Sequence, residues 1–339
     1  MTVPGMLARI VLLGGALPAL ALACCGGQSG SGAAAHPTPP SAAAPVPASD
    51  ADNDRTLLVG PNHLLKLPSQ AAQVAQNGDT VLIDPGNYND CAIWRQSHLT
   101  IAASGPGVVL SGKTCGGKAI FVVAGTDVTV RGITFMHAVV PDHNGAGIRL
   151  HDGNLLVDHD RFVDNEEGIL GGETPRTTVR IVDSEFSGNG NCKAQCAHGV
   201  YVGQITLLDI EDSRFTDTHE GHDIKSRALR TVLGGNDISD GPTGHASYLV
   251  DISNGGDLLM EHNTLSKGPH TDNETTAVAI GAEGVRNPTH SLVIRDNTFT
   301  NLLPMQTAFV TNHTLTPAEL VGNRLVGRVV PLVGPGTVK

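Results

Sequence analysis

Apolar and polar residues alternate along most of this chain in short runs that end in one recurring phrase. An aliphatic run is followed by an acid or amide, one further residue and then Phe, Leu or Ile, as in LLVDHDRF, which ends at Phe162. The phrase recurs with its last residue at Phe135, Phe186, Phe215, Ile238, Leu265, Phe299 and Leu325, at intervals of 23 to 34 residues. One supersecondary unit repeated at such a period is typical of a solenoid.

The repeated unit is predicted to consist of strands. Apolar residues alternate with a period of two, as at Val179 and Ile181, and no window sustains an apolar face at helical period. Residues that favour tight turns stand two positions before the end of the phrases from Phe162 onward: Asp160, Ser184, Ser213, Asn236, Asn263, Asn297 and Asn323. A stack of parallel coils would place these residues in a ladder.

The pattern resembles the right-handed parallel β-helix of the pectin-lyase-like superfamily, from about Asp79 to Val326. Residues 78–90 (GDTVLIDPGNYND) resemble the first coil of these solenoids, and residues 67–76 (LPSQAAQVAQ) form an amphipathic segment that would cap the open end. We therefore predict an all-β, single-stranded right-handed parallel β-helix of about eight to ten coils with a short N-terminal capping helix. A β-sandwich or barrel is the alternative, but neither repeats one phrase so often.

The N-terminal region predicts export. Residues 1–23 read as a signal peptide, with Arg9 before an apolar run. Leu22-Ala23-Cys24 resembles a bacterial lipobox, which implies lipidation of Cys24, with Cys25 or ordinary secretion as alternatives. Residues 24–55 are rich in Pro, Ala and Gly and are predicted to be a disordered tether. Residues 56–339 then form one β-helix domain, held in the bacterial cell envelope and facing the periplasm or the exterior.

Composition limits the residue types that can form the core and the classes of partner that the chain is expected to bind. Only 3% of the residues are aromatic, so the core is expected to be stacked Val, Ile and Leu. The chain has 22 Lys and Arg and 33 Asp and Glu, and removal of Arg9 with the signal leaves 21 minus 33, or −12. Without a basic cluster, nucleic acid is not an expected partner. We expect a monomer that meets a membrane only through its lipid anchor.

Beyond Cys24 and Cys25 the chain has four cysteines, and export favours disulfides. Cys91 and Cys115 are 24 residues apart, close to one repeat, so they would lie on adjacent coils; Cys192 and Cys196 would close a small loop. A metal site of Cys192, Cys196 and His198 is disfavoured, because the spacing matches no common zinc motif. No metal or other cofactor is predicted, although calcium stays open.

The second strand of each unit predicts which side chains share an outer face. Alignment of these strands predicts that one aliphatic residue of each points inward: Ile120, Ile148, Ile169, Val200, Ile224, Val250 and Val278. The next residue of each strand then forms an outward column of Phe121, Arg149, Leu170, Tyr201, Lys225, Asp251 and Ala279, and a column two residues further includes His151 and Arg227. Because coils stack at about 4.8 Å, neighbours in a column can touch, and Arg149 would lie about 14 Å from Lys225.

The densest group of ionisable residues surrounds Lys225. The segment HEGHDIKSR (219–227) supplies Glu220, His222, Asp223 and Arg227, and His198 aligns with His222 on the preceding coil. On a surface otherwise rich in Gly, Ala and Val, this concentration predicts the functional site.

The resemblance implies a lyase or epimerase acting on a uronate polymer. Elimination beside a carboxylate needs a base, a group that stabilises the enolate and an acid for the leaving oxygen. We predict Lys225 as the base, with its pKa lowered by Arg227 and a charged His222. The predicted catalytic set is Lys225, Arg227, His222, Tyr201 and Asp251, with Tyr201 or His222 as the acid. The predicted substrate-binding set is Arg149, His151, His198, Asp223 and Glu220.

Two other functions stay open. A polygalacturonase-like hydrolase would use Asp223 and Asp251, although the Asn-x-Asp and Asp-Asp elements of those enzymes are missing. A non-catalytic glycan-binding or structural envelope lipoprotein would need no catalytic set, since Lys225 and Asp251 would form a surface ion pair contributing at most about 1 kcal/mol. The Asp-Pro-His-Asp signature of alginate epimerases is also absent, the nearest text being Val140-Pro141-Asp142-His143. Convergence of the predicted residues in a groove would favour an enzyme.

The predicted lipid anchor is tested by Cys24→Ser. A chain held by one lipidated cysteine loses its anchor when that residue is replaced, so the variant should move from the membrane fraction to the soluble fraction. Cys25→Ser is the matched control and should stay with the membrane. Unchanged fractionation of Cys24→Ser would contradict the assignment.

Overall fold

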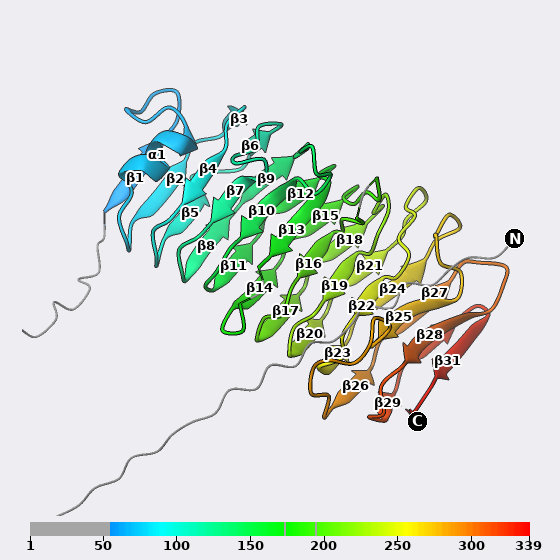
Figure 1. The fold of residues 1–339 in the computed structure, drawn as a ribbon. Helices are drawn as coiled ribbons and strands as arrows, with labels where there is room; N and C mark the ends of the chain where they lie inside the picture. The colour runs from blue at the N-terminus through cyan, green and yellow to red at the C-terminus, as the bar shows by residue number, and fades with distance from the viewer. Residues whose placement is uncertain (1–54, 173, 194) are drawn as a thin grey trace, which may run out of the picture. The chain divides into compact units, whose positions relative to one another are not determined.

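The computed structural model describes residues 55–339 except 173 and 194. The predicted signal peptide, Cys24 and nearly all of the predicted tether lie outside the described residues. The described chain winds into three parallel sheets, whose strands lie in three rows along the solenoid (Figure 1). Each coil contributes one strand to sheet A, then one to sheet B and one to sheet C. Within the described residues, no helix is long and apolar enough to cross a membrane.

The strands pair with their equivalents in the next coil. Sheet A contains β1 Thr56–Val59, β2 Thr80–Ile83, β5 Thr100–Ala103, β8 Val128–Arg131, β11 Leu155–Asp158, β14 Thr178–Val182, β17 Leu207–Glu211, β20 Arg230–Gly234, β23 Asp257–Glu261, β26 Leu292–Arg295, β29 Ala318–Val321 and β32 Gly336–Val338. Sheet B contains β3 Gly86–Tyr88, β6 Val108–Ser111, β9 Ile133–Met136, β12 Arg161–Val163, β15 Glu185–Ser187, β18 Arg214–Thr216, β21 Asp237–Ser239, β24 Thr264–Lys267, β27 Thr298–Asn301 and β30 Arg324–Val326. Sheet C contains β4 Ala92–Trp94, β7 Ala119–Val123, β10 Ala146–Leu150, β13 Glu167–Gly171, β16 Val200–Val202, β19 Ile224–Ser226, β22 Val250–Ile252, β25 Thr276–Ile280, β28 Thr307–Asn312 and β31 Val329–Val333.

The solenoid has about 11 turns, slightly more than the predicted eight to ten. The additional turns lie at the N-terminal end. There Tyr88 and Leu110 take the place of the phrase-ending residue, since Tyr88 pairs with Leu110 and Leu110 with Phe135. Their strands lack the acid or amide two positions earlier, so the repeat is visible in the structure but not in the phrase.

The phrase-ending residues stack inside the solenoid. The rings of Phe135, Phe162, Phe186 and Phe215 follow one another at centroid distances of 5.3, 4.7 and 4.6 Å. The core is therefore aliphatic and aromatic, whereas the low aromatic content predicted aliphatic residues alone. Gly147 makes room for this stack, because a Cβ there would lie 2.6 Å from Cδ1 of Phe162.

The turn residues before each phrase end form the predicted ladder between sheets A and B. The Asn263 side-chain nitrogen donates to the Leu233 carbonyl and to Oδ1 of Asn297, each at 2.9 Å. Oδ1 of Asn263 accepts from the backbone and side-chain nitrogens of Asn236, both at 2.9 Å. Each amide thus satisfies buried backbone groups of the adjacent coil.

The N-terminal helix and the disulfides lie where they were expected. Helix α1, Pro68–Val74, contacts β1 and β4 and buries Ala71 in the hydrophobic core. Both predicted disulfides are present, with Cα–Cα distances of 5.5 Å for Cys91–Cys115 and 4.0 Å for Cys192–Cys196.

Replacing one ladder amide should destabilise the whole solenoid. Asn263→Ala leaves buried backbone and amide groups of two neighbouring coils without partners, so we expect a loss of about 3 kcal/mol in the free energy of unfolding. Urea unfolding measures this loss. Asn87→Ala is the matched control, since Asn87 is exposed on β3 and no hydrogen bond of its side chain is found in the described region. Equal stability of the two variants would contradict the role of the ladder.

Candidate functional site

The outer face of sheet C carries the predicted column of side chains. Leu170 pairs with Tyr201, Tyr201 with Lys225 and Lys225 with Asp251, as predicted. The predicted outward column was wrong by one residue at β7. Ile148 pairs with Phe121 and Arg149 pairs with Val122, so Val122 and not Phe121 belongs to the column. Phe121 points inward, where its ring packs edge-on against Trp94 and Phe135 at 5.5 and 5.0 Å.

Lys225 lies between two carboxylates. Its side chain is only 9% exposed, and its Nζ lies 2.5 Å from Oε1 of Glu283 and 3.2 Å from Oδ2 of Asp251. Ser253 donates its hydroxyl to the same Asp251 oxygen at 2.6 Å. Burial raises the pKa of Asp251, although Lys225 and Ser253 oppose this effect.

Arg227 extends the network across the strand ends. Its Nη2 donates to Oε2 of Glu283 at 2.5 Å, its Nη1 to Oδ1 of Asn254 at 2.5 Å and its Nε to the Tyr201 hydroxyl at 2.9 Å. Lys225 and Arg227 therefore hold the two oxygens of one carboxylate, and we call this pair the carboxylate clamp. Burial would raise the pKa of Glu283, but the hydrogen bonds from Lys225 and Arg227 outweigh it and lower that pKa.

Glu283 and Asn254 were not predicted from the sequence. Both lie in turns that follow strands of sheet C, outside the repeated phrase. One signal was available, because the turn carrying Glu283 lies within the longest interval between phrases, 34 residues from Leu265 to Phe299. That turn folds back over its neighbours, since the Asn287 side chain donates to the carbonyls of Arg227 and Ala228 at 3.0 and 3.1 Å.

His198, His222 and Tyr248 form a ring ladder beside the network. The two imidazoles stack at 4.9 Å, and His222 stacks on Tyr248 at 5.0 Å. Nδ1 of His198 accepts the backbone N–H of His222 at 3.0 Å, and Nδ1 of His222 accepts that of Tyr248 at 3.1 Å. Each neutral ring therefore carries its proton on Nε2, which for His222 lies 3.6 Å from Oδ2 of Asp251.

The histidines are uncharged, contrary to the expectation for His222. Burial and, to a smaller extent, the charges of Lys225 and Lys267 together lower the pKa of His222 to about 3. Burial also lowers the pKa of His198 well below its usual range. A neutral His222 cannot act as the neighbouring positive charge that was expected to lower the pKa of Lys225.

Asp223 does not face the site. It is fully buried and accepts a hydrogen bond from the Thr218 hydroxyl at 2.6 Å. Burial raises its pKa well above the usual range, and the neighbouring Asp240 charge adds to the effect while Lys267 opposes it. Asp223 therefore lies among Thr218, Asp240 and Lys267, whereas Asp251 contacts Lys225 and Ser253, so the two carboxylates share no partner.

The remaining predicted binding residues lie outside the network. Glu220 accepts the backbone N–H of Cys192 at 2.6 Å, and His151 is exposed. Burial lowers the pKa of Arg149, which has no hydrogen bond or ion pair within the described part of the chain. Glu167, which was not predicted, is 1% exposed, and burial raises its pKa well above the usual range.

A cavity of about 340 Å³ opens beside the clamp. It is lined by Tyr201, Gln204, Arg227, Asn254, Glu283, Arg286 and Asn287. We call it the proximal cavity. The site therefore combines a clamped carboxylate, a phenol and several amides at one polar opening, as binding pockets for polar ligands require.

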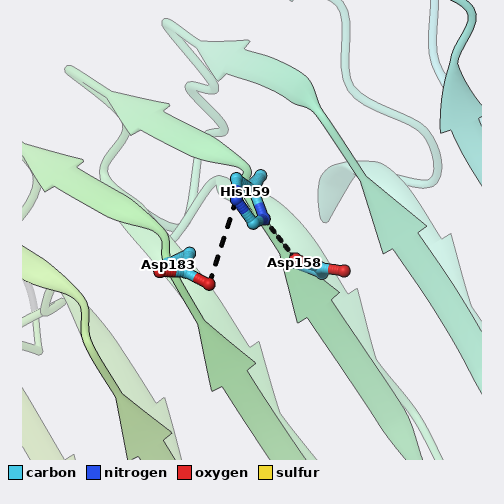
Figure 2. A group of neighbouring side chains, drawn as sticks. All are labelled: Asp158, His159 and Asp183. Carbon is cyan, nitrogen blue, oxygen red and sulfur yellow. Dashed lines mark hydrogen bonds and ion pairs between the residues drawn. The ribbon is translucent and has the colours of Figure 1, made fainter.

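A separate cluster of Asp158, His159 and Asp183 lies where β11 and β14 of sheet A end (Figure 2). One ligand atom from each lies within 4.8 Å of the others, as a metal ion would need. His159 and Asp183 are largely exposed, and Arg131 already pairs with Asp158. The cluster belongs to the ends of sheet A strands, whereas the clamp lies at sheet C, and we assign the cluster no function.

The neutral state of His222 predicts a pH dependence of stability. Its pKa is about 3 in the folded protein and near 6.5 when unfolded, so the unfolded chain binds more protons between these values and stability falls as pH drops below about 6.5. The expected contribution is about 2 kcal/mol between pH 7 and pH 5. His222→Gln should reduce this dependence in urea unfolding at both pH values. His290→Gln is the matched control, since His290 is exposed and has no side-chain hydrogen bond or ion pair within the described residues, and equal slopes in the two variants would contradict the assignment.

No family model and no curated protein match the chain. Among solved structures, an alginate lyase from Paenibacillus sp. strain FPU-7 is similar with a TM-score of 0.52 and 16% identity, covering 79% of this chain and 95% of that one. A lacto-N-biosidase from Eubacterium ramulus has a TM-score of 0.49 and 12% identity, covering 84% and 67%. A pectate lyase, Pel9A, has a TM-score of 0.44 and 12% identity, covering 82% and 80%. The likeness to the alginate lyase concerns the fold alone, and this chain has the right-handed parallel β-helix fold predicted from the sequence.

Proposed function

We propose that this protein acts on an acidic polysaccharide at the outer face of sheet C, as a uronate-polymer lyase or epimerase. The carrying observation is the carboxylate clamp, in which Lys225 and Arg227 each approach one oxygen of the Glu283 carboxylate to 2.5 Å. A uronate sugar carries the same group and can be recognised by the same charge-assisted hydrogen bonds. In this proposal Glu283 occupies the position of a substrate carboxylate and leaves when substrate binds.

The clamp also has the chemistry needed to abstract a proton next to a carboxylate. Removal of the carbon-bound proton places negative charge on the carboxylate oxygens, and the Arg227 guanidinium stabilises that charge. Lys225 is the proposed base. Its ammonium must first lose a proton, for which Asp251, 3.2 Å away and with its pKa raised by burial, is the adjacent acceptor.

Tyr201 is the proposed acid. Its oxygen accepts a hydrogen bond from Arg227, which orients the phenol and leaves its own proton available for a leaving oxygen. In the lyase reaction, Lys225 takes the proton from the carbon next to the carboxylate, and that electron pair forms a double bond. The glycosidic carbon–oxygen bond breaks, and the leaving oxygen takes the Tyr201 proton. An epimerase would instead return a proton to the opposite face of the carbanion.

His222 supports this arrangement without exchanging protons with substrate. Its Nδ1 is occupied by the backbone of Tyr248, and its Nε2 faces Asp251 at 3.6 Å. The hydrolase alternative receives no support from geometry, since Asp223 is fully buried against Thr218 and has no contact with the clamp within the described residues. The alginate lyase that is similar in structure is a polysaccharide enzyme, which agrees with the general class proposed here. The proposed place of action is the cell envelope, with the lipid on Cys24.

The proposal is tested by the ultraviolet absorbance of unsaturated uronate products on alginate, pectate and chondroitin. Wild type should generate absorbance on one of these polymers, or, as an epimerase, an NMR signal of inverted uronate. Lys225→Ala and Tyr201→Phe should each lower kcat at least about a hundredfold, because each removes a proton-transfer group. Glu283→Gln should lower KM, because the competing carboxylate is gone.

Lys66→Ala is the control for Lys225→Ala, since Lys66 is exposed on another part of the solenoid. Urea unfolding of each variant separates loss of activity from loss of fold. Polysaccharide binding by wild type with neither unsaturated nor inverted product would refute both enzyme reactions and leave the glycan-binding function.

A further inference from the structure

A second and larger cavity lies along the same edge of the solenoid as the clamp. It has a volume of about 920 Å³ and is lined by residues that include Ser97, Thr126, Asp152, Asn154, Thr174 and Arg176. We call it the distal cavity. Its lining of hydroxyl, amide, carboxylate and guanidinium groups matches the hydrogen-bonding needs of sugar hydroxyls and carboxylates.

The two cavities follow consecutive turns of the chain. The turns that follow β4, β7, β10 and β13 line the distal cavity. Strand β16 and the turns that follow β16, β19, β22 and β25 line the proximal cavity. These are eight neighbouring strands of sheet C. At about 4.8 Å between coils, they extend for about 34 Å along the edge where sheet C gives way to sheet A.

The turns that line the two cavities adjoin each other after β13 and β16. The Thr206 backbone N–H donates to the Thr177 carbonyl at 2.9 Å, and its hydroxyl donates to the Pro175 carbonyl, so these turns are directly bonded. Near this junction the Gln204 and Asn287 side chains share a hydrogen bond of 3.2 Å. Neutral amides exchange such a bond for bonds to sugar hydroxyls at small net cost.

Arg176 gives the distal cavity an available cation. It is exposed and has no hydrogen bond or ion pair within the described residues, unlike Arg131, Arg161, Arg180 and Arg295, which pair with carboxylates. Its turn precedes that of Arg227 by two coils, about 10 Å along the axis. A linear polyuronate presents carboxylates at regular intervals, so a single chain can meet Arg227 and Arg176 together.

We propose that one polyuronate chain binds along this edge, with one sugar at the clamp and further sugars in the distal cavity, where Arg176 holds a second carboxylate. This inference rests on the proposed function, since it extends the same site to a longer substrate. It requires an oligosaccharide of several units for full affinity. Short oligosaccharides would reach only the proximal cavity.

Calorimetric titration with alginate and pectate oligosaccharides, from disaccharide to octasaccharide, tests the proposal. For wild type, affinity should rise with length until the distal cavity is filled. Arg176→Ala should lower octasaccharide affinity about tenfold, the size of one lost charge-assisted hydrogen bond, and leave disaccharide affinity unchanged. Arg324→Ala is the matched control, because Arg324 is exposed on β30 of sheet B and also lacks an ion pair within the described residues.

The outcomes separate the two proposals. Disaccharide binding without any gain in affinity for longer chains would overturn the extended site and leave the proposed function intact. Equal octasaccharide affinity of Arg176→Ala and Arg324→Ala would also overturn it. Binding of no oligosaccharide of either polymer would overturn the proposed function and this inference together.

Discussion

The structure depends on parallel backbone pairing between successive coils, repeated in register along the solenoid. Pairing at about 4.8 Å places equivalent side chains of successive coils directly above one another. The side chain at each position must therefore pack favourably against the equivalent side chain of the next coil. Phenylalanines stack inside, and amides link in the turns, where each side chain both donates and accepts. Like charges cannot stack in this way. The outer face of sheet C instead alternates Lys225 with Asp251 on adjacent strands.

Burial sets this charged cluster apart from an ordinary surface ion pair. The Lys225 and Asp251 side chains are 9% and 2% exposed, so removing one partner would leave an uncompensated buried charge. Glu283 adds a second carboxylate from a turn that contributes nothing to the repeat. A protein that needed only a stable solenoid would gain more from aliphatic residues at these positions, as at Leu170 and Ala279 in the same column. The cluster is therefore better explained by ligand chemistry than by stability.

The sequence predicted the solenoid and the register of most of the site because both follow from a local repeat. Tyr201, Lys225 and Asp251 each stand one residue after an inward aliphatic residue, and pairing brought them together as expected. Phe121 was placed outward because two adjacent apolar residues, Ile120 and Phe121, fit the pattern in either register. Glu283 and Asn254 escaped prediction because irregular turns carry no period. Neither the burial of Asp223 nor the neutral state of His222 can be read from residue type, since both depend on what covers the side chain.

Strand β19 and the residue before it depart from the repeat. Outward it carries Lys225, and directly before it the buried Asp223 lies near Asp240 and Lys267. Lys267 donates to the carbonyls of Ala246 and Ser247 at 3.3 and 2.6 Å, which ties this inner cluster to the turn that leads into β22 and Asp251. Violations of local pattern concentrate where a protein has a function to perform. Here the inner cluster connects the residue before β19, which carries Lys225, to the turn before β22, which carries Asp251.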